Sequence, residues 1–286
     1  MGHHLRKIPH KQFLNVMGMT EDKIAPAEPQ PHADDIFGDL ATSVAPLMMF
    51  LNFVPAGGGI LNALIGPGPC LLDAATPGSV WTTQTLRSMV EMNEFELEEV
   101  HAEGVSAEDK LALRLYTLET PLKIYELLNA PFKNQLRTPE RCRSQGPFAR
   151  LLIESIRRLS KLEEYVYEGV AYRGIRIAGT APFQLELQRK FDDHLASFPV
   201  GSRMTFAPFT SLTLSEEVAE GFGDAIVFVF TKVRGVRLRK FSAMPGEEEV
   251  LLEPPTVFKV ISCAKFSGVV QVVLESVASP LKYLST

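Results

Sequence analysis

A chain of 286 residues with 45% hydrophobic and 22% charged side chains has the composition of a globular protein and can bury a sizeable core. Its formal net charge of −5 gives no overall positive field, which argues against nucleic acid or an anionic membrane as the main partner. The cysteines, Cys70, Cys142 and Cys263, are far apart and outside any Cys-x-x-Cys spacing, so neither a disulfide framework nor a zinc site is expected.

Residues 1–80 form an N-terminal extension with two contrasting segments. The first 35 residues lack the charged start and apolar stretch of a secretory signal, so we expect a flexible lead-in without a classical signal peptide. Residues 41–72 carry no charge, but prolines and glycines divide them into pieces shorter than the ~20 residues that a membrane-spanning helix needs. We expect residues 44–54 and 60–65 to be short buried segments packing on the main domain, with a membrane-touching or partner-binding loop as the alternative.

Residues 81–164 have the hydrophobic periodicity of helices. The pattern predicts helices over residues 82–100, 106–125 and 148–162. Ser106 followed by Asp109 resembles a capping box, and Pro121 should kink or divide the helix that begins there. These segments together predict a helical lobe.

Residues 165–286 change to the pattern of strands. Residues 225–230 form a short apolar run typical of a strand buried on both faces, and residues 257–262 and 269–276 supply two more strands. Val236 and Leu238 alternate with Arg237 and Arg239, which predicts a separate, half-exposed edge strand whose arginines serve solubility rather than polyanion binding. Helices followed by strands indicate an α+β fold rather than a doubly wound parallel sheet.

A run of carboxylates stands at the start of one expected strand. Glu247, Glu248 and Glu249 lead directly into an apolar segment at residues 250–252. If this segment is extended throughout, Glu247 and Glu249 point to the same side and Glu248 points away. Two carboxylates held together can divide their work, one staying ionised and the other handling a proton. A solvated charge cluster at a turn is the alternative.

Three short motifs occur in order in the strand half of the chain. They are Tyr172-Arg173-Gly174, then Ser211-Leu212-Thr213, then Glu247-Glu248-Glu249 followed by Val250-Leu251-Leu252. In this order they resemble the arginine, serine and Glu-x-Glu signature of mono-ADP-ribosyltransferases of the Arg-Ser-Glu clade, which includes clostridial-type toxins and vertebrate arginine-specific ecto-enzymes. The resemblance covers about residues 111–276. It implies a catalytic domain over residues 81–286, with a helical lobe at 81–164 and a mixed or antiparallel β-sandwich core at 165–286.

The resemblance implies that the protein cleaves the bond between nicotinamide and ribose in NAD. Glu249 would stabilise the positive charge that develops on the ribose, and Ser211 would hold Glu249 in place. Arg173 would bind the phosphates and ribose of NAD. Gly174 would allow close approach of the backbone to the nicotinamide amide, and Phe222 would pack on the nicotinamide ring, with an ordinary core phenylalanine as the alternative.

The resemblance also bears on the acceptor of the ADP-ribose. Glutamate at the position of Glu247 accompanies arginine modification in the family, so transfer to a protein arginine is expected, with Glu247 orienting and helping to deprotonate the guanidinium. The loop before it resembles the substrate-recognition turn, with Phe241 and Met244 as its apolar contacts. The alternatives are an NAD glycohydrolase, a transferase to another acceptor and, without enzymatic activity, a membrane- or partner-binding module.

The remaining expectations concern cofactor, partner and location. NAD is expected as a substrate and no metal is expected, because His101, His194 and the N-terminal histidines show no metal spacing. The expected partner is an acceptor protein, not nucleic acid, and the expected state is a monomer. The expected location is the cytoplasm, or export as an effector without a cleavable signal.

Overall fold

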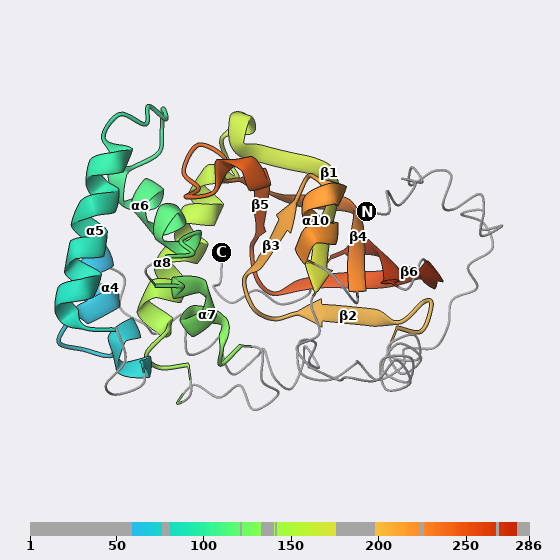
Figure 1. Ribbon diagram of the computed structural model, residues 1–286, viewed down its shortest axis with the longest axis horizontal. Coiled ribbons are helices and arrows are strands. Elements are labelled where there is room, and N and C mark those ends of the chain that lie inside the picture. The colour runs from blue at the N-terminus through green and yellow to red at the C-terminus, as the bar shows by residue number, and fades with distance from the viewer. Residues whose placement is uncertain are drawn as a thin grey trace, which may run out of the picture.

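The computed structural model describes residues 59–75, 81–120, 122–132, 140, 142–175, 198–222, 226–266 and 269–278. Most helices gather on one side of the molecule and the strands on the other, where α10 (Glu216–Phe222) packs against two of these strands (Figure 1). The predicted change from helices to strands therefore corresponds to a division in space, and the predicted α+β class is confirmed. The sequence-predicted segment at residues 44–54 and Pro121 lie outside the described residues.

The helical lobe consists of α4 (Gly59–Ile65), the 3₁₀ turn η2 (Leu71–Ala74), α5 (Thr83–Leu97), α6 (Ala107–Tyr116), α7 (Ile124–Asn129) and α8 (Gly146–Leu159). The hydroxyl of Ser106 accepts a hydrogen bond from the backbone N–H of Asp109 at 3.1 Å, which confirms the predicted start of α6. The predicted long helix is divided, because α6 ends at Tyr116 and α7 begins at Ile124. Within the described residues, no helix is both long and apolar enough to cross a membrane.

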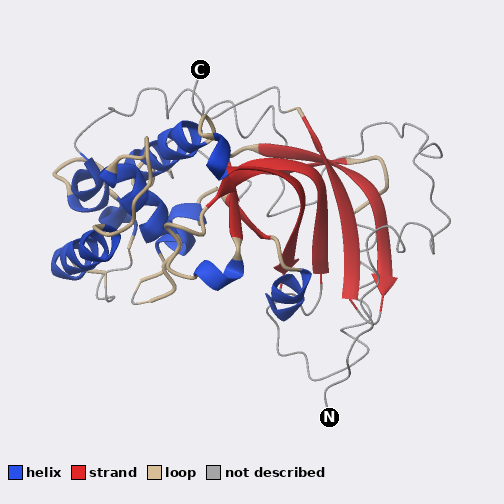
Figure 2. Cartoon of the chain, turned by 90° about the horizontal axis from the view of Figure 1, so that it is seen from above, coloured by secondary structure: helices blue, strands red, loops and turns tan. Residues whose placement is uncertain are grey.

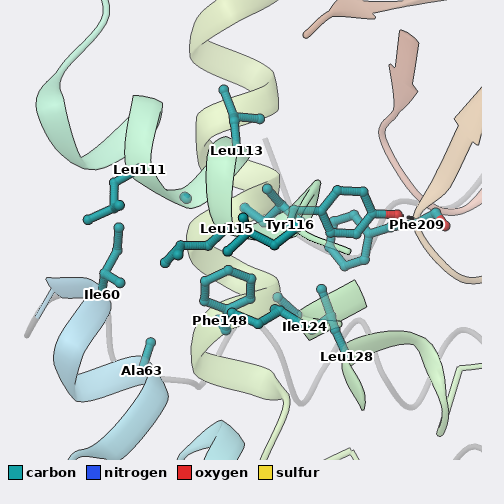
Figure 3. Packing of buried hydrophobic residues seen from close by; sticks show 14 of the residues in the cluster. Ile60, Ala63, Leu111, Leu113, Leu115, Tyr116, Ile124, Leu128, Phe148 and Phe209 are labelled. Carbon is teal, nitrogen blue, oxygen red and sulfur yellow. Dashed lines mark hydrogen bonds between the residues drawn. The ribbon is translucent and has the colours of Figure 1, made fainter. Parts of the chain in front are cut away.

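One hydrophobic core joins these helices (Figure 3). Ile60 and Ala63 of α4 pack with Leu111 of α6, so this segment packs on the main domain as predicted, but only through one face, because Leu61 and Asn62 are exposed. Arg158 of α8 forms an ion pair with the buried Asp109 of α6 at 2.6 Å, which satisfies a carboxylate that is only 1% exposed. The same core extends to the sheet, because Phe209 and Leu251 belong to it.

The strands are β1 (Val166–Ile175), β2 (Arg203–Phe206), β3 (Thr210–Thr213), β4 (Ile226–Arg237), β5 (Glu249–Leu252), β6 (Thr256–Phe266) and β7 (Val269–Val277). They hydrogen-bond as one seven-stranded sheet in the order β1-β3-β5-β4-β7-β6-β2, and β1 also pairs with β4. The β4–β7 pair is parallel and the other recorded pairs are antiparallel, so the predicted mixed β core is confirmed, with its strands in one curved sheet in place of the two sheets of a sandwich.

The sheet curves round its own hydrophobic core (Figure 2). Each of the seven strands contributes a residue to this core: Ala171, Phe206, Leu212, Phe228, Val250, Phe258 and Val272. β1 pairs with both β3 and β4, and β5 lies between β3 and β4, so these four strands form a closed ring. This ring brings the ends of β1, β3 and β5 together, and these strands carry Arg173, Ser211 and Glu249.

The prediction of a separate edge strand at residues 236–239 is wrong. β4 is one strand from Ile226 to Arg237, and it pairs with β1, β5 and β7. Lys232 has a positive φ of 55°, and the register with β1 shifts beside it, so a bulge exposes Lys232 and interrupts the apolar pattern. The guanidinium of Arg237 lies 4.8 Å from the centre of the Tyr167 ring, which gives this arginine a packing role as well as a charge.

Candidate active site

A cavity of about 480 Å³ lies where the helical lobe meets the sheet. Its lining comes from α6, α7, β1, β3, β5, the loop before β5, and α10 (Glu216–Phe222). The cavity brings together six of the sequence-predicted site residues: Arg173, Gly174, Ser211, Phe222, Glu247 and Glu249. These residues are up to 76 positions apart in the chain (249 − 173), so the fold and not local sequence assembles the cavity.

The pairing of β3 with β5 places Ser211 beside Glu249. Ser211 is opposite Leu251 and Thr213 is opposite Glu249 in this antiparallel pair. Ser211 and Glu249 are therefore diagonal neighbours on one face of the sheet. The hydroxyl of Ser211 hydrogen-bonds the carboxyl of Glu249. Leu212 lies on the opposite face and packs into the core of the sheet.

Arg173 of β1 is hydrogen-bonded to β3 of the same strand pair. Its Nη1 donates a hydrogen bond to the backbone oxygen of Ser211 at 2.8 Å. Burial lowers the pKa of the Arg173 guanidinium, while the nearby Tyr116 and Glu249 favour its charged form. Arginine remains protonated in proteins, so Arg173 supplies a fixed positive charge inside the cavity.

Glu249 is a buried carboxyl with a strongly shifted titration. It is 7% exposed, and burial raises its pKa from 4.5 to about 7. The Ser211 hydrogen bond and the charge of Arg173 oppose this rise, whereas the negative charge of Glu247 adds to it. A carboxyl that titrates near neutrality beside a fixed cation can stabilise a positive charge on a bound molecule when it is ionised.

The backbone conformation that brings Glu247 to the cavity differs from the one expected from the sequence. The expectation of an extended segment from Glu247 to Glu249 is wrong, because η4 (Pro245–Glu247) is a 3₁₀ turn and Glu248 has a left-handed φ of 48°. The strand begins only at Glu249. Thr213 donates a 2.6 Å hydrogen bond to the backbone oxygen of Glu247, which fixes the turn against β3. Both carboxylates still line the cavity, with Glu248 exposed outside it.

The acceptor-loop residues have different environments. Phe241 is fully buried, and its ring lies 5.4 Å from that of Tyr165, so the prediction that it contacts an acceptor is wrong. Its large apolar side chain anchors the loop in the core of the helical lobe. Met244 is 43% exposed but is not part of the cavity lining, and its contact with an acceptor stays a prediction. Phe222 is 51% exposed and lines the cavity, which excludes the alternative of an ordinary core phenylalanine.

The helical lobe supplies cavity residues that the sequence did not reveal. Asn129 of α7 donates to the backbone oxygen of Phe209 at 3.4 Å and accepts from its N–H at 3.0 Å, which holds the chain just before β3. The hydroxyl of Tyr116 also donates to the oxygen of Phe209, and the two rings lie side by side (Figure 3). The signal available in the sequence was an asparagine at the end of a mostly apolar helical segment.

Metal ligation is not seen in the part of the chain that the structure describes. No group of three or more His, Cys, Asp or Glu side chains there is arranged to hold a metal ion. Among the described residues that line the cavity, the charged groups are Arg173 and the carboxylates of Glu119, Glu247 and Glu249.

The fold and the cavity define a member of the ADP-ribosyltransferase class. Residues 79–280 match the family model described as NAD:arginine ADP-ribosyltransferase, and the chain belongs to this family. It is 36% identical over 112 residues to NAD(P)(+)--arginine ADP-ribosyltransferase 1 of Gallus gallus, covering 39% of this chain and 29% of that protein. It is 28% identical over 160 residues to ecto-ADP-ribosyltransferase 5 of Homo sapiens, covering 55% of this chain and 50% of that protein. The matches thus span half or less of these relatives.

Solved structures of the same class resemble the chain at low identity. The ADP-ribosyltransferase HopU1 of Pseudomonas syringae shares 19% identity with a TM-score of 0.47, covering 85% of this chain and 100% of that one. The eucaryotic mono-ADP-ribosyltransferase ART2.2, in complex with NADH, shares 19% identity with a TM-score of 0.49, covering 70% of this chain and 82% of that one.

Proposed function

We propose that the protein transfers ADP-ribose from NAD to an arginine side chain of an acceptor protein and releases nicotinamide. The observation that carries the proposal is the buried carboxyl of Glu249, hydrogen-bonded to Ser211, beside Arg173 in one cavity. Membership of the NAD:arginine ADP-ribosyltransferase family supports the same conclusion. The cavity of about 480 Å³ falls in the ordinary range for small-molecule sites.

Cleavage of the glycosidic bond is the step that Glu249 would assist. The bond between C1′ of the ribose and the nicotinamide nitrogen breaks, and its electron pair leaves with nicotinamide. Positive charge develops on the ribose, and the ionised carboxylate of Glu249 stabilises it. The Ser211 hydrogen bond favours this ionised form and fixes its position. Arg173, held against the Ser211 carbonyl, offers its guanidinium to the phosphates of NAD.

Transfer to arginine is the step that Glu247 would assist. A guanidino nitrogen of the acceptor forms a bond to C1′, and the proton that it loses passes to Glu247 and then to solvent. Burial and the nearby charge of Glu119 raise the pKa of Glu247, which makes its carboxylate a better proton acceptor. Water in place of the guanidino group would give hydrolysis of NAD by the same first step.

Labelled NAD tests the proposal directly. Purified protein is incubated with NAD labelled in its adenylate part and a cell lysate, and nicotinamide release is measured beside protein labelling. Protein bands whose label survives denaturation, and whose modified residue is arginine by mass spectrometry, are expected. The variant Glu249→Gln is the matched control and should release no nicotinamide. The proposal would be refuted if the native protein produced no protein labelling and released no nicotinamide. Release without labelling would identify a glycohydrolase.

A further inference from the structure

A third carboxylate faces the cavity from the helical lobe. Glu119 follows α6 and lines the cavity, to which Glu247 contributes from the turn before β5. Its negative charge acts on the other carboxyls of the cavity, because it helps to raise the pKa of both Glu247 and Glu249. The side chain of Glu119 is 43% exposed, so it stands at the mouth of the cavity and meets solvent. The cavity therefore receives carboxylates both from the helical lobe and from the segment that enters β5.

The chain's own Lys123 shows that the Glu119 position holds a cation. The Lys123 ammonium lies 2.9 Å from the carboxylate of Glu119 and 6.0 Å from the centre of the Tyr125 ring, and Tyr125 also lines the cavity. The hydrogen bond to Glu119 is the main cause of the raised pKa of Lys123. A carboxylate beside an aromatic face also suits a guanidinium, which is planar and donates through several N–H groups.

We propose that Glu119 is a second acceptor-binding carboxylate in the same cavity as Glu247, and that Lys123 is an internal counter-ion which the acceptor guanidinium displaces. The inference rests on the proposed transfer to arginine. Lys123 has an alternative partner, because Glu126 lies 3.6 Å from its ammonium and is 59% exposed. Lys123 can therefore move to Glu126 and leave Glu119 to the acceptor. Glu119 thus selects cationic acceptors, while Glu247 handles the proton.

Glu126 supplies a matched control. Glu119 and Glu126 both pair with Lys123 and both are exposed, but only Glu119 lines the cavity. An ordinary surface ion pair would make their replacements equivalent. A role in acceptor binding makes them different.

The experiment compares E119Q, E126Q and the unchanged chain with NAD and the small guanidino acceptor agmatine, at about pH 8.5 so that Glu249 is ionised in each. The quantity measured is transfer to agmatine divided by hydrolysis of NAD in the same reaction. E119Q should raise the KM for agmatine about fivefold, and this ratio should fall by the same factor at low agmatine. E126Q should keep the ratio of the unchanged chain.

Removing the counter-ion provides the opposite test. K123M should lower the KM for agmatine, because Glu119 is then free, and it should have no effect in the E119Q background. Equal ratios for E119Q and E126Q, or a raised KM in K123M, would overturn the role of Glu119 while leaving the transferase function intact. A native protein that neither hydrolyses NAD nor modifies agmatine would overturn both proposals.

Discussion

Replacing Glu249 with glutamine is expected to stabilise the fold while it removes activity. Glutamine has nearly the same shape and can still accept the Ser211 hydrogen bond, but it carries no charge. Activity should be lost because no carboxylate remains to stabilise the charged ribose. Stability should rise because a buried charge is costly in the folded chain and costs little in the unfolded one.

The shifted pKa of Glu249 sets the size of the stability effect. The shift from 4.5 to about 7 corresponds to about 3 kcal/mol, at about 1.4 kcal/mol for each pKa unit. Between these values the unfolded chain has lost the proton and the folded chain still holds it, so stability falls as pH rises through this window. Below 4.5 both states are protonated and the effect vanishes, and above about 7 it stays constant.

Urea unfolding of the native chain and E249Q, followed by circular dichroism from about pH 4 to 8.5, measures this effect. The difference in unfolding free energy between the two proteins should grow by about 3 kcal/mol across the window and then level off. Comparing the pair cancels the titration of the other groups. A difference that does not change with pH would refute the buried, proton-holding state of Glu249. Nicotinamide release by E249Q would refute its catalytic role.

Three further substitutions test the remaining parts of the site. E247Q should lose arginine labelling and keep NAD hydrolysis, measured as nicotinamide release; persistent labelling would contradict the role of Glu247. S211A should lose less activity than E249Q. Its rate should rise with pH as Glu249 ionises, and the midpoint of that rise should lie above about 7, because the hydrogen bond that this variant loses lowers the pKa of Glu249; an unchanged midpoint would contradict this. N129L should destabilise the fold by about 2 kcal/mol in urea, because the Phe209 N–H loses its partner and the Phe209 oxygen keeps only the Tyr116 hydroxyl; an unchanged midpoint would argue against this clamp.

The site residues on strands could be predicted from the sequence because their motifs are local and ordered. Arg173, Ser211 and Glu249 each lie in a short motif in the strand half of the chain, and the family resemblance supplied their meeting point. The sequence alone did not reveal the register in which β3 and β5 pair. Ser211 meets Glu249 only because β3 and β5 pair as Thr213 to Glu249, and a shift by one residue would turn one side chain to the opposite face.

Positions set by turns and by distant packing were not predicted. Glu248 has a left-handed φ, which the alternation of apolar and polar residues along a strand does not predict. Phe241 was expected to face an acceptor because its loop resembles the family's substrate-recognition turn, yet its apolar ring is buried against Tyr165. Asn129 holds Phe209 across 80 positions of sequence. Periodicity identifies the buried face of a helix but not the partner that the face will meet.

The two halves of the proposed reaction are held by different parts of the fold. Glu249 belongs to a strand of the sheet, whereas the loop before Glu247 is tied to α6 and its C-terminal cap. Arg114 donates to the Ser242 oxygen at 2.7 Å, and the Thr117 hydroxyl accepts from the Ala243 N–H at 2.8 Å.

The acceptor side therefore includes both this loop and Glu119, two residues beyond Thr117. A small movement of α6 against the sheet would shift Glu119 and pull on the loop before Glu247, whose turn Thr213 holds against β3, and would leave the Arg173–Ser211 contact in place. The balance between transfer and hydrolysis should thus respond to changes in α6 that leave cleavage of NAD intact.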